Sequence, residues 1–211
     1  MPIKLDIDTS NTRTPNQSSR HGADPAWIVV HYTGVACQFG DTTARYMRRA
    51  SSKVSAHFIV DHQSIIQVVP VHMQAWHVGG GQPDKRYERA ADAEKFHEGI
   101  GRNFTGNRIS IGIELCVEKT TISKRVEDTD WFFAQETAFT TAHLIAALMQ
   151  RYHIDIDHVI RHMDATGKPC PRPFVSLRAD GDRTNDDAWE SFKLTANAFS
   201  KINSYSARIT R

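Results

Sequence analysis

The chain has 211 residues, of which 40% are hydrophobic and 24% are charged, and its formal net charge is +2. This length and composition are typical of one globular domain that can bury an apolar core. The charge is too small to indicate a nucleic-acid partner, and three cysteines are too few for a disulfide scaffold.

The N-terminal residues 1–26 are polar and contain no apolar core of the length that a secretory signal requires. Elsewhere no stretch approaches the roughly 18 apolar residues of a membrane span. We therefore expect a protein that is made in the cytoplasm and has no membrane partner. The predicted organisation is a polar segment over 1–24, one folded domain over 25–200 and a C-terminal tail over 201–211, with loose order after Phe199.

The predicted strands are short apolar segments, and the predicted helices repeat their apolar residues at helical spacing. The continuous apolar run over 27–31 predicts a central strand that is buried on both faces. Further strands are predicted at 56–60, 65–69, 109–117 and 159–160, and helices at 41–49, 131–152 and 187–199. This order predicts an α/β fold in a single domain, with a mixed central β-sheet flanked by helices.

Residues 79–108 interrupt the pattern with a charged, glycine-containing insertion. Loops of this length inside a compact domain are usually functional or flexible. Because the insertion directly follows Trp76 and His77, it could form one wall of a binding groove. The alternative is a solvated excursion that contacts no ligand.

Three potential metal ligands lie far apart in the chain. His31 ends the predicted central strand, and His162 and Cys170 flank a short segment whose following prolines restrict the backbone. Two imidazoles and one thiolate give Zn²⁺ three protein ligands and leave a fourth position for water, as in catalytic zinc sites. The alternative is a buried structural histidine with an inert cysteine, since this spacing matches none of the short zinc motifs. The pattern points to a metal hydrolase with one zinc ion per chain.

Six separated motifs occur in a characteristic order along the chain. They are the segments 31–34, 55–61, 67–70, 75–79, 110–116 and 161–171. Together they resemble the zinc-dependent N-acetylmuramoyl-L-alanine amidases of the type-2 amidase family, which includes T7-like phage lysozymes and peptidoglycan recognition proteins. Within that superfamily the chain is most similar to the phage endolysin and Bacillus autolysin branch. The resemblance covers about residues 25–175.

The resemblance implies hydrolysis of the amide bond between N-acetylmuramic acid and L-alanine in peptidoglycan, with lysis of bacterial cell walls. It implies a monomer that reaches the wall after holin-type release or lysis. It assigns His31, His162 and Cys170 as zinc ligands, Glu114 as the general base, and Lys168 as the cation that stabilises the oxyanion of the tetrahedral intermediate. Strand alternation alone leaves open whether Glu114 faces the site or solvent.

The resemblance also implies that His77 and Trp76 bind substrate. Some relatives carry an aromatic residue, often tyrosine, where this chain has Ala56. The departure removes a possible hydroxyl group from the site and leaves more of the chemistry to Glu114 and Lys168. Asp164 could orient a metal ligand or cap the loop.

Two other functions remain open at this stage. A non-catalytic peptidoglycan-binding module would typically lack the cysteine ligand, and an amidase of soluble muropeptides in wall recycling more often uses aspartate as the third ligand. Cys170 argues against both. Cys37 and Cys116 are interpreted as reduced packing residues, because a protein made in the cytoplasm keeps its thiols reduced. Host and stem-peptide specificity are not encoded in these motifs.

Overall fold

The computed structural model describes residues 2–10, 12–36, 39–81, 94–100, 105–123, 125, 127–176 and 184–210. Cys37 and part of the predicted insertion lie outside these residues. The strands are β1 (Ile3–Leu5), β2 (Ile7–Asp8), β3 (Gln17–Ser19), β4 (Trp27–Ala36), β5 (Phe58–Val60), β6 (Ile65–Gln67), β7 (Met73–Ala75), β8 (Ser110–Lys119), β9 (Trp131–Phe132), β10 (Val159–Arg161) and β11 (Tyr205–Ala207). The α-helices are α1 (Gly40–Met47), α2 (Glu94–Ile100), α3 (Gly106–Ile109), α4 (Gln135–Tyr152), α5 (His162–Thr166) and α6 (Thr184–Ile202), and the 3₁₀ turns are η1 (Ile156–His158) and η2 (Arg172–Phe174). Among the described helices, none combines the length and the apolar character that crossing a bilayer requires.

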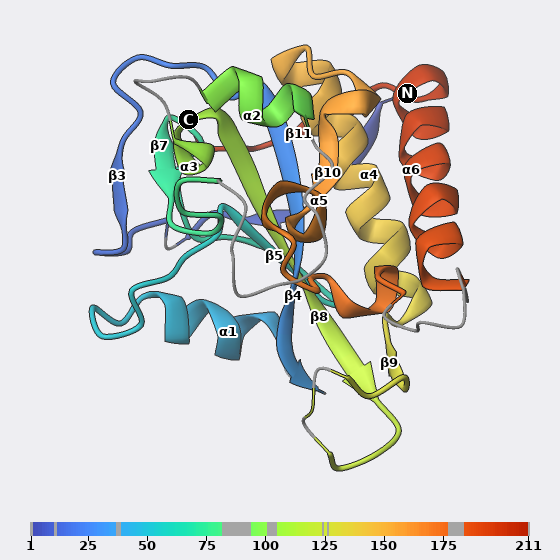
Figure 1. Cartoon of the computed structure of the whole chain (residues 1–211). Coiled ribbons are helices and arrows are strands. Elements are labelled where there is room, and N and C mark those ends of the chain that lie inside the picture. Colours follow the sequence, from blue (N-terminus) through green and yellow to red (C-terminus); the bar gives the residue numbers. More distant parts are fainter. Residues whose placement is uncertain are drawn as a thin grey trace.

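The main sheet has the strand order β10-β4-β8-β5-β6-β2, and β9 pairs with the end of β8 outside this order. The strands β10, β4, β8 and β5 run parallel to one another, whereas β6 runs antiparallel to β5. Figure 1 shows β4 and β8 side by side through the middle of the domain, with α4 and α6 adjacent to each other. The structure therefore confirms the predicted α/β fold with a mixed central sheet and flanking helices.

The two faces of the sheet are covered by different helices. Phe58 and Val60 of β5 belong to the large apolar cluster that includes residues of α4 and α6. Ile59, which points the opposite way, packs with Ala44 and Met47 of α1. Successive strand residues alternate between faces, so α1 lies across the sheet from α4 and α6. On β8 the same alternation puts the isoleucines of this strand on the α4 face, and the opposite face is left for its polar residues.

The predicted helix over 131–152 begins four residues later than expected, at Gln135. Trp131 and Phe132 instead pair with the end of β8. The ammonium group of Lys119 lies 4.9 Å from the centre of the Trp131 ring and donates to the carboxylates of Asp128 and Asp130. These contacts hold the aromatic residue in a hairpin and prevent it from joining the helix.

The chain after Phe199 is ordered by pairing, which corrects the prediction of a loose tail. Helix α6 continues to Ile202, and β11 then pairs in parallel with β1, with Ile3 opposite Tyr205. Ile209 is buried, and the amide of Thr210 donates to the Gln67 side chain. Apolar residues from both ends of the chain belong to the same core cluster as residues of α4, and their burial stabilises the C-terminal tail.

The described part of the insertion is packed against the domain. Phe96 of α2 is fully buried, and its ring meets that of Trp27 edge-on, with centroids 5.2 Å apart. His97 contacts the carbonyl oxygen of Ala165, beside the predicted metal ligands, at 2.8 Å. Residues 82–93 and 101–104 lie outside the described ranges, and the proposed groove wall stays a prediction.

Candidate metal centre

The three predicted zinc ligands converge on one point. The Nδ1 atoms of His31 and His162 are 2.9 Å apart, and the Sγ atom of Cys170 is 3.8 Å from Nδ1 of His31. All three donor atoms lie within 4.8 Å of one another, and all three residues are buried. The strand register explains the first pair, because Arg161 at the end of β10 lies opposite Val30 of β4. His162 therefore follows the end of its strand next to His31.

Cys170 reaches the site because the chain turns back after the short helix α5. Gly167 adopts a left-handed conformation with φ of 84° at the end of this helix, which a side chain would disfavour. The amide of Met163 then donates to the carbonyl oxygen of Cys170 at 2.8 Å. The turn thus ties the third ligand to the helix that begins with the second ligand.

The start of α5 is held by a buried ion pair. The carboxylate of Asp164 accepts hydrogen bonds from the backbone and the guanidinium group of Arg161, the shortest at 2.6 Å. The same guanidinium donates to Asp186 of α6 at 2.6 Å. Of the two roles that the sequence left open for Asp164, the structure shows the capping role, and this fixes the backbone that carries His162.

The donor set fits a zinc ion. Two imidazole nitrogens and a thiolate are preferred zinc ligands, with bond lengths of about 2.0–2.3 Å. Burial, together with the charges of His162, His77 and Lys168, holds the pKa of His31 well below 6.5, so its ring is neutral as a ligand must be. Without a metal ion, burial raises the pKa of the Cys170 thiol to about 12. A bound metal ion would reverse that preference, since a coordinating thiol is deprotonated.

Glu114 lies on the strand next to His31 and on the same face of the sheet. In the parallel register of β4 and β8, His31 is its direct partner. One carboxylate oxygen, Oε2, is buried and has no hydrogen-bond partner among the described residues. Burial raises the pKa of Glu114 to about 8, against the opposing effect of the charge on Lys168. A carboxyl group with this pKa can accept and release a proton near neutral pH.

Lys168 is exposed and precedes Cys170 by two residues. Its charge lowers the pKa of His31 and opposes the effect of burial on the pKa values of Glu114 and Cys170. The structure does not test its predicted role as oxyanion stabiliser.

His77 and Trp76, the two predicted substrate residues, make further contacts within the protein. Nδ1 of His77 lies 3.0 Å from Nε2 of His31, and the indole N–H of Trp76 donates to the Ser18 hydroxyl at 2.7 Å. Both side chains are half-buried. Their contact with substrate stays a prediction.

Two residues that the sequence does not single out hold His77 in place. The Asn107 side-chain oxygen accepts hydrogen bonds from the backbone amides of His77 and Val78, at 3.0 and 2.9 Å. The Ser110 hydroxyl lies 3.2 Å from Nε2 of His77. Ser110 begins one of the six motifs, whereas Asn107 falls within the predicted insertion, where no local pattern marks it.

Arg20, in the segment predicted to precede the domain, is buried beneath this cluster. Its guanidinium group donates to the carbonyl oxygens of Val71, Arg108 and Ser110, and lies 2.8 Å from Nε2 of His57. Burial lowers the pKa of Arg20 to about 10. The sequence gives no signal for this role, because the composition of the N-terminal segment is polar and typical of a solvent-exposed segment.

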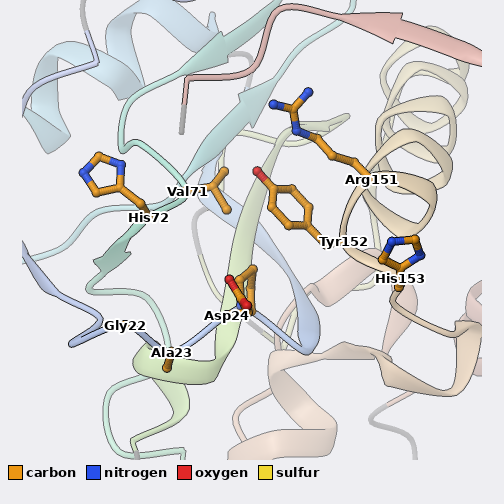
Figure 2. A pocket seen from close by; sticks show the side chains of 9 residues that line it. Gly22, Ala23, Asp24, Val71, His72, Arg151, Tyr152 and His153 are labelled. Carbon is orange, nitrogen blue, oxygen red and sulfur yellow. The ribbon is translucent and has the colours of Figure 1, made fainter.

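A separate hollow of about 370 Å³ lies at the C-terminal end of α4, with Asp24, Arg151 and Tyr152 among its lining residues (Figure 2). The Tyr152 hydroxyl is buried without a hydrogen-bond partner in the described structure. None of the three predicted zinc ligands lines this hollow, so it is a different feature of the surface.

Comparison with known sequences finds the same family that the six motifs resemble. A family model described as N-acetylmuramoyl-L-alanine amidase, Amidase_2, matches residues 21–173. The amidase XlyA of Bacillus subtilis is 31% identical over 180 residues, covering 84% of this chain and 46% of XlyA. The amidase CwlH of the same organism is 30% identical over 193 residues, covering 90% of this chain and 59% of CwlH. The chain thus spans about half the length of these curated relatives.

Solved structures share the fold. The catalytic domain of XlyA superposes with a TM-score of 0.57 at 28% identity, covering 92% of this chain and 97% of that domain. A mutant endolysin from Bacillus subtilis gives a TM-score of 0.56 at 27% identity, covering 93% of this chain and 99% of the other. The chain therefore matches nearly the whole of each of these structures.

Proposed function

The chain belongs to the Amidase_2 family of N-acetylmuramoyl-L-alanine amidases, and from this premise we propose that it hydrolyses the bond between N-acetylmuramic acid and L-alanine in peptidoglycan with one zinc ion. The observation that carries the proposal is the convergence of His31, His162 and Cys170 within 4.8 Å. The buried carboxyl group of Glu114 on the adjacent strand supports it.

The reaction needs help because an amide is a weak electrophile at neutral pH. Held by the two imidazoles and the thiolate, Zn²⁺ would lower the pKa of a water molecule and polarise the carbonyl oxygen. The three ligands come from the middle of strand β4, the start of helix α5 and the turn that follows this helix, and backbone hydrogen bonds tie these segments together. Because these three ligands are fixed in position, they would leave a fourth position on the ion free for water or substrate.

Glu114 is the proposed general base. Its carboxylate would take the proton from the attacking water and then pass it to the leaving amine of L-alanine. In the metal-free site, burial raises the pKa of Glu114 to about 8, so its carboxylate is a stronger base than that of an exposed glutamate, and the charge of Lys168 opposes this rise.

Lys168 would stabilise the oxyanion of the tetrahedral intermediate, and loss of one such group typically costs about 3–4 kcal/mol of transition-state stabilisation. His77 and Trp76 would contact the glycan or the stem peptide. We propose that the protein acts as a monomer on the bacterial wall, after holin-type release or lysis, as an endolysin or autolysin.

The test is digestion of purified peptidoglycan followed by mass spectrometry. New L-alanine amino termini are expected, and Glu114→Gln should abolish them while Glu136→Gln on the exposed surface of α4 leaves them unchanged. New reducing ends would instead indicate a glycosidase. Binding to the wall without any product would favour a peptidoglycan-binding module, and activity on soluble muropeptides alone would favour a wall-recycling amidase.

A further inference from the structure

A chain of hydrogen-bonding groups leads from Nε2 of His31, through His77 and Ser110, to a backbone carbonyl oxygen. Nε2 of His31 lies 3.0 Å from Nδ1 of His77, and Nε2 of His77 lies 3.2 Å from the Ser110 hydroxyl oxygen. That hydroxyl donates to the carbonyl oxygen of Gly106 at 2.6 Å. The opposite nitrogen of His31, Nδ1, faces the other two metal ligands.

The last member of the chain fixes the direction of every hydrogen bond. A carbonyl oxygen only accepts, so the single hydrogen of Ser110 is used on Gly106. The Ser110 oxygen must then accept from Nε2–H of His77. A neutral imidazole has one N–H, so Nδ1 of His77 carries a lone pair and accepts from Nε2–H of His31. As a result, Nδ1 of His31 keeps its lone pair for the metal.

The opposite direction would disable the ligand. If Nδ1 of His77 carried the hydrogen, it would donate to Nε2 of His31. The single hydrogen of a neutral His31 would then sit on Nδ1, where it would block coordination. The order of donors in this chain therefore decides whether His31 can bind a metal ion.

The ring of His77 is held tightly enough to enforce this order. A side chain on Gly112 of β8 would place its Cβ 2.5 Å from Cγ of His77, so the ring packs directly on the backbone of the strand. The Asn107 side chain fixes the backbone of His77 from the other side. Only glycine at position 112 leaves room for the ring.

We propose that His77 and Ser110 are positioning residues that hold His31 in the Nε2–H tautomer, so that its Nδ1 lone pair is directed at the zinc ion. The inference rests on the zinc site of the proposed function and adds to the expected contact of His77 with substrate. Replacing a residue that hydrogen-bonds to a metal-binding histidine commonly weakens metal affinity by about 10- to 100-fold.

The first test measures zinc affinity by chelator competition. His77→Ala should weaken binding by about 10- to 100-fold. His77→Asn should restore most of the affinity, because its side-chain oxygen can occupy the acceptor position of Nδ1. Ser110→Ala and Gly112→Ala should weaken binding through the same chain. His62→Ala removes an exposed histidine and serves as the matched control with unchanged affinity.

The second test reads the tautomer directly in the metal-free wild-type protein. Long-range ¹H–¹⁵N NMR spectra should show Nε2–H for both His31 and His77, and Ser110→Ala should produce a mixture at His77. An Nδ1–H tautomer at His31 in the wild type would overturn the proposal, as would unchanged zinc affinity in folded His77→Ala and Ser110→Ala variants. Failure of the wild type to bind zinc would contradict the proposed function instead, because the tautomer assignment needs no metal.

Discussion

His31 of β4 and Glu114 of β8 are direct partners in the parallel register of the two central strands. Side chains at paired positions of neighbouring strands emerge on the same face of a sheet. The register thus brings a neutral imidazole and a carboxyl group together beside the point where His162 and Cys170 arrive from the next strand and its following turn. The chemistry of the site depends on strand pairing more than on any single loop.

Removal of one ligand should remove the metal without unfolding the protein. We expect Cys170→Ala and His162→Ala to reduce the zinc content from about one ion per chain to almost none and to abolish wall lysis, because two ligands bind zinc weakly. Elemental analysis of purified protein measures the content, and circular dichroism checks the fold. Cys116→Ala is the matched control, since Cys116 is buried in the apolar cluster with α1. A full complement of zinc in the Cys170 variant would contradict the assignment.

The pKa of Glu114 predicts a pH dependence of stability in the metal-free protein. The folded pKa of about 8 lies above the unfolded value of 4.5, so the folded state holds a proton that the unfolded state has released. The stabilising effect of this proton is complete below pH 4.5 and is lost as the pH rises toward 8. The slope is at most about 1.4 kcal/mol per pH unit. Because the buried histidines have the opposite pH dependence, the quantity to follow is the difference in unfolding free energy between the wild type and Glu114→Gln. In urea unfolding this difference should shift against the wild type between pH 5 and pH 8. A difference that does not change with pH would contradict the raised pKa of Glu114.

His57 predicts the opposite dependence at lower pH. Burial and the nearby charges of Arg20 and His77 hold its folded pKa well below 6.5, so the unfolded state gains a proton that the folded state excludes. The contribution of His57 to the free energy of unfolding is fully present above pH 6.5. It falls by up to about 1.4 kcal/mol per pH unit as the pH decreases below that value. His57→Asn should reduce the decline, because its oxygen can still accept the hydrogen bond from the Gly112 amide. Thermal unfolding between pH 7 and 5 measures this, with His62→Asn as the exposed control. A decline that His57→Asn leaves unchanged would contradict the assignment.

The sequence predicts the parts of this protein that follow from local patterns. The apolar run before His31 and the helical spacing within 135–152 indicate the correct elements, and the three ligands that the residue types predict lie together in the structure, where they could hold a metal ion. The β1–β11 pair and the buried Arg20 depend on contacts between segments that are distant in the chain. Arg20 reaches acceptors 51 and 90 residues later, at Val71 and Ser110, and no local pattern carries that information.

Arg20 should be essential for the stability of the domain although it lies in a polar N-terminal segment. Arg20→Ala would leave the carbonyl oxygens of Val71, Arg108 and Ser110 without this donor and would open a cavity beside His57. Each unsatisfied buried acceptor costs about 1–3 kcal/mol, so we expect a loss of about 3–5 kcal/mol in the free energy of unfolding.

The measurement is urea unfolding of Arg20→Ala beside Arg13→Ala, which removes an exposed arginine from the same segment and should change stability by less than about 0.5 kcal/mol. Arg20→Lys should fall between the two, because an ammonium group keeps the charge but cannot reproduce the planar set of donors. His57 contacts Arg20 and accepts a hydrogen bond from the amide of Gly112, and Gly112 in turn packs against the ring of His77. Zinc affinity should therefore also fall in Arg20→Ala. Equal stabilities of Arg20→Ala and Arg13→Ala would contradict a stabilising role of the buried hydrogen bonds of Arg20.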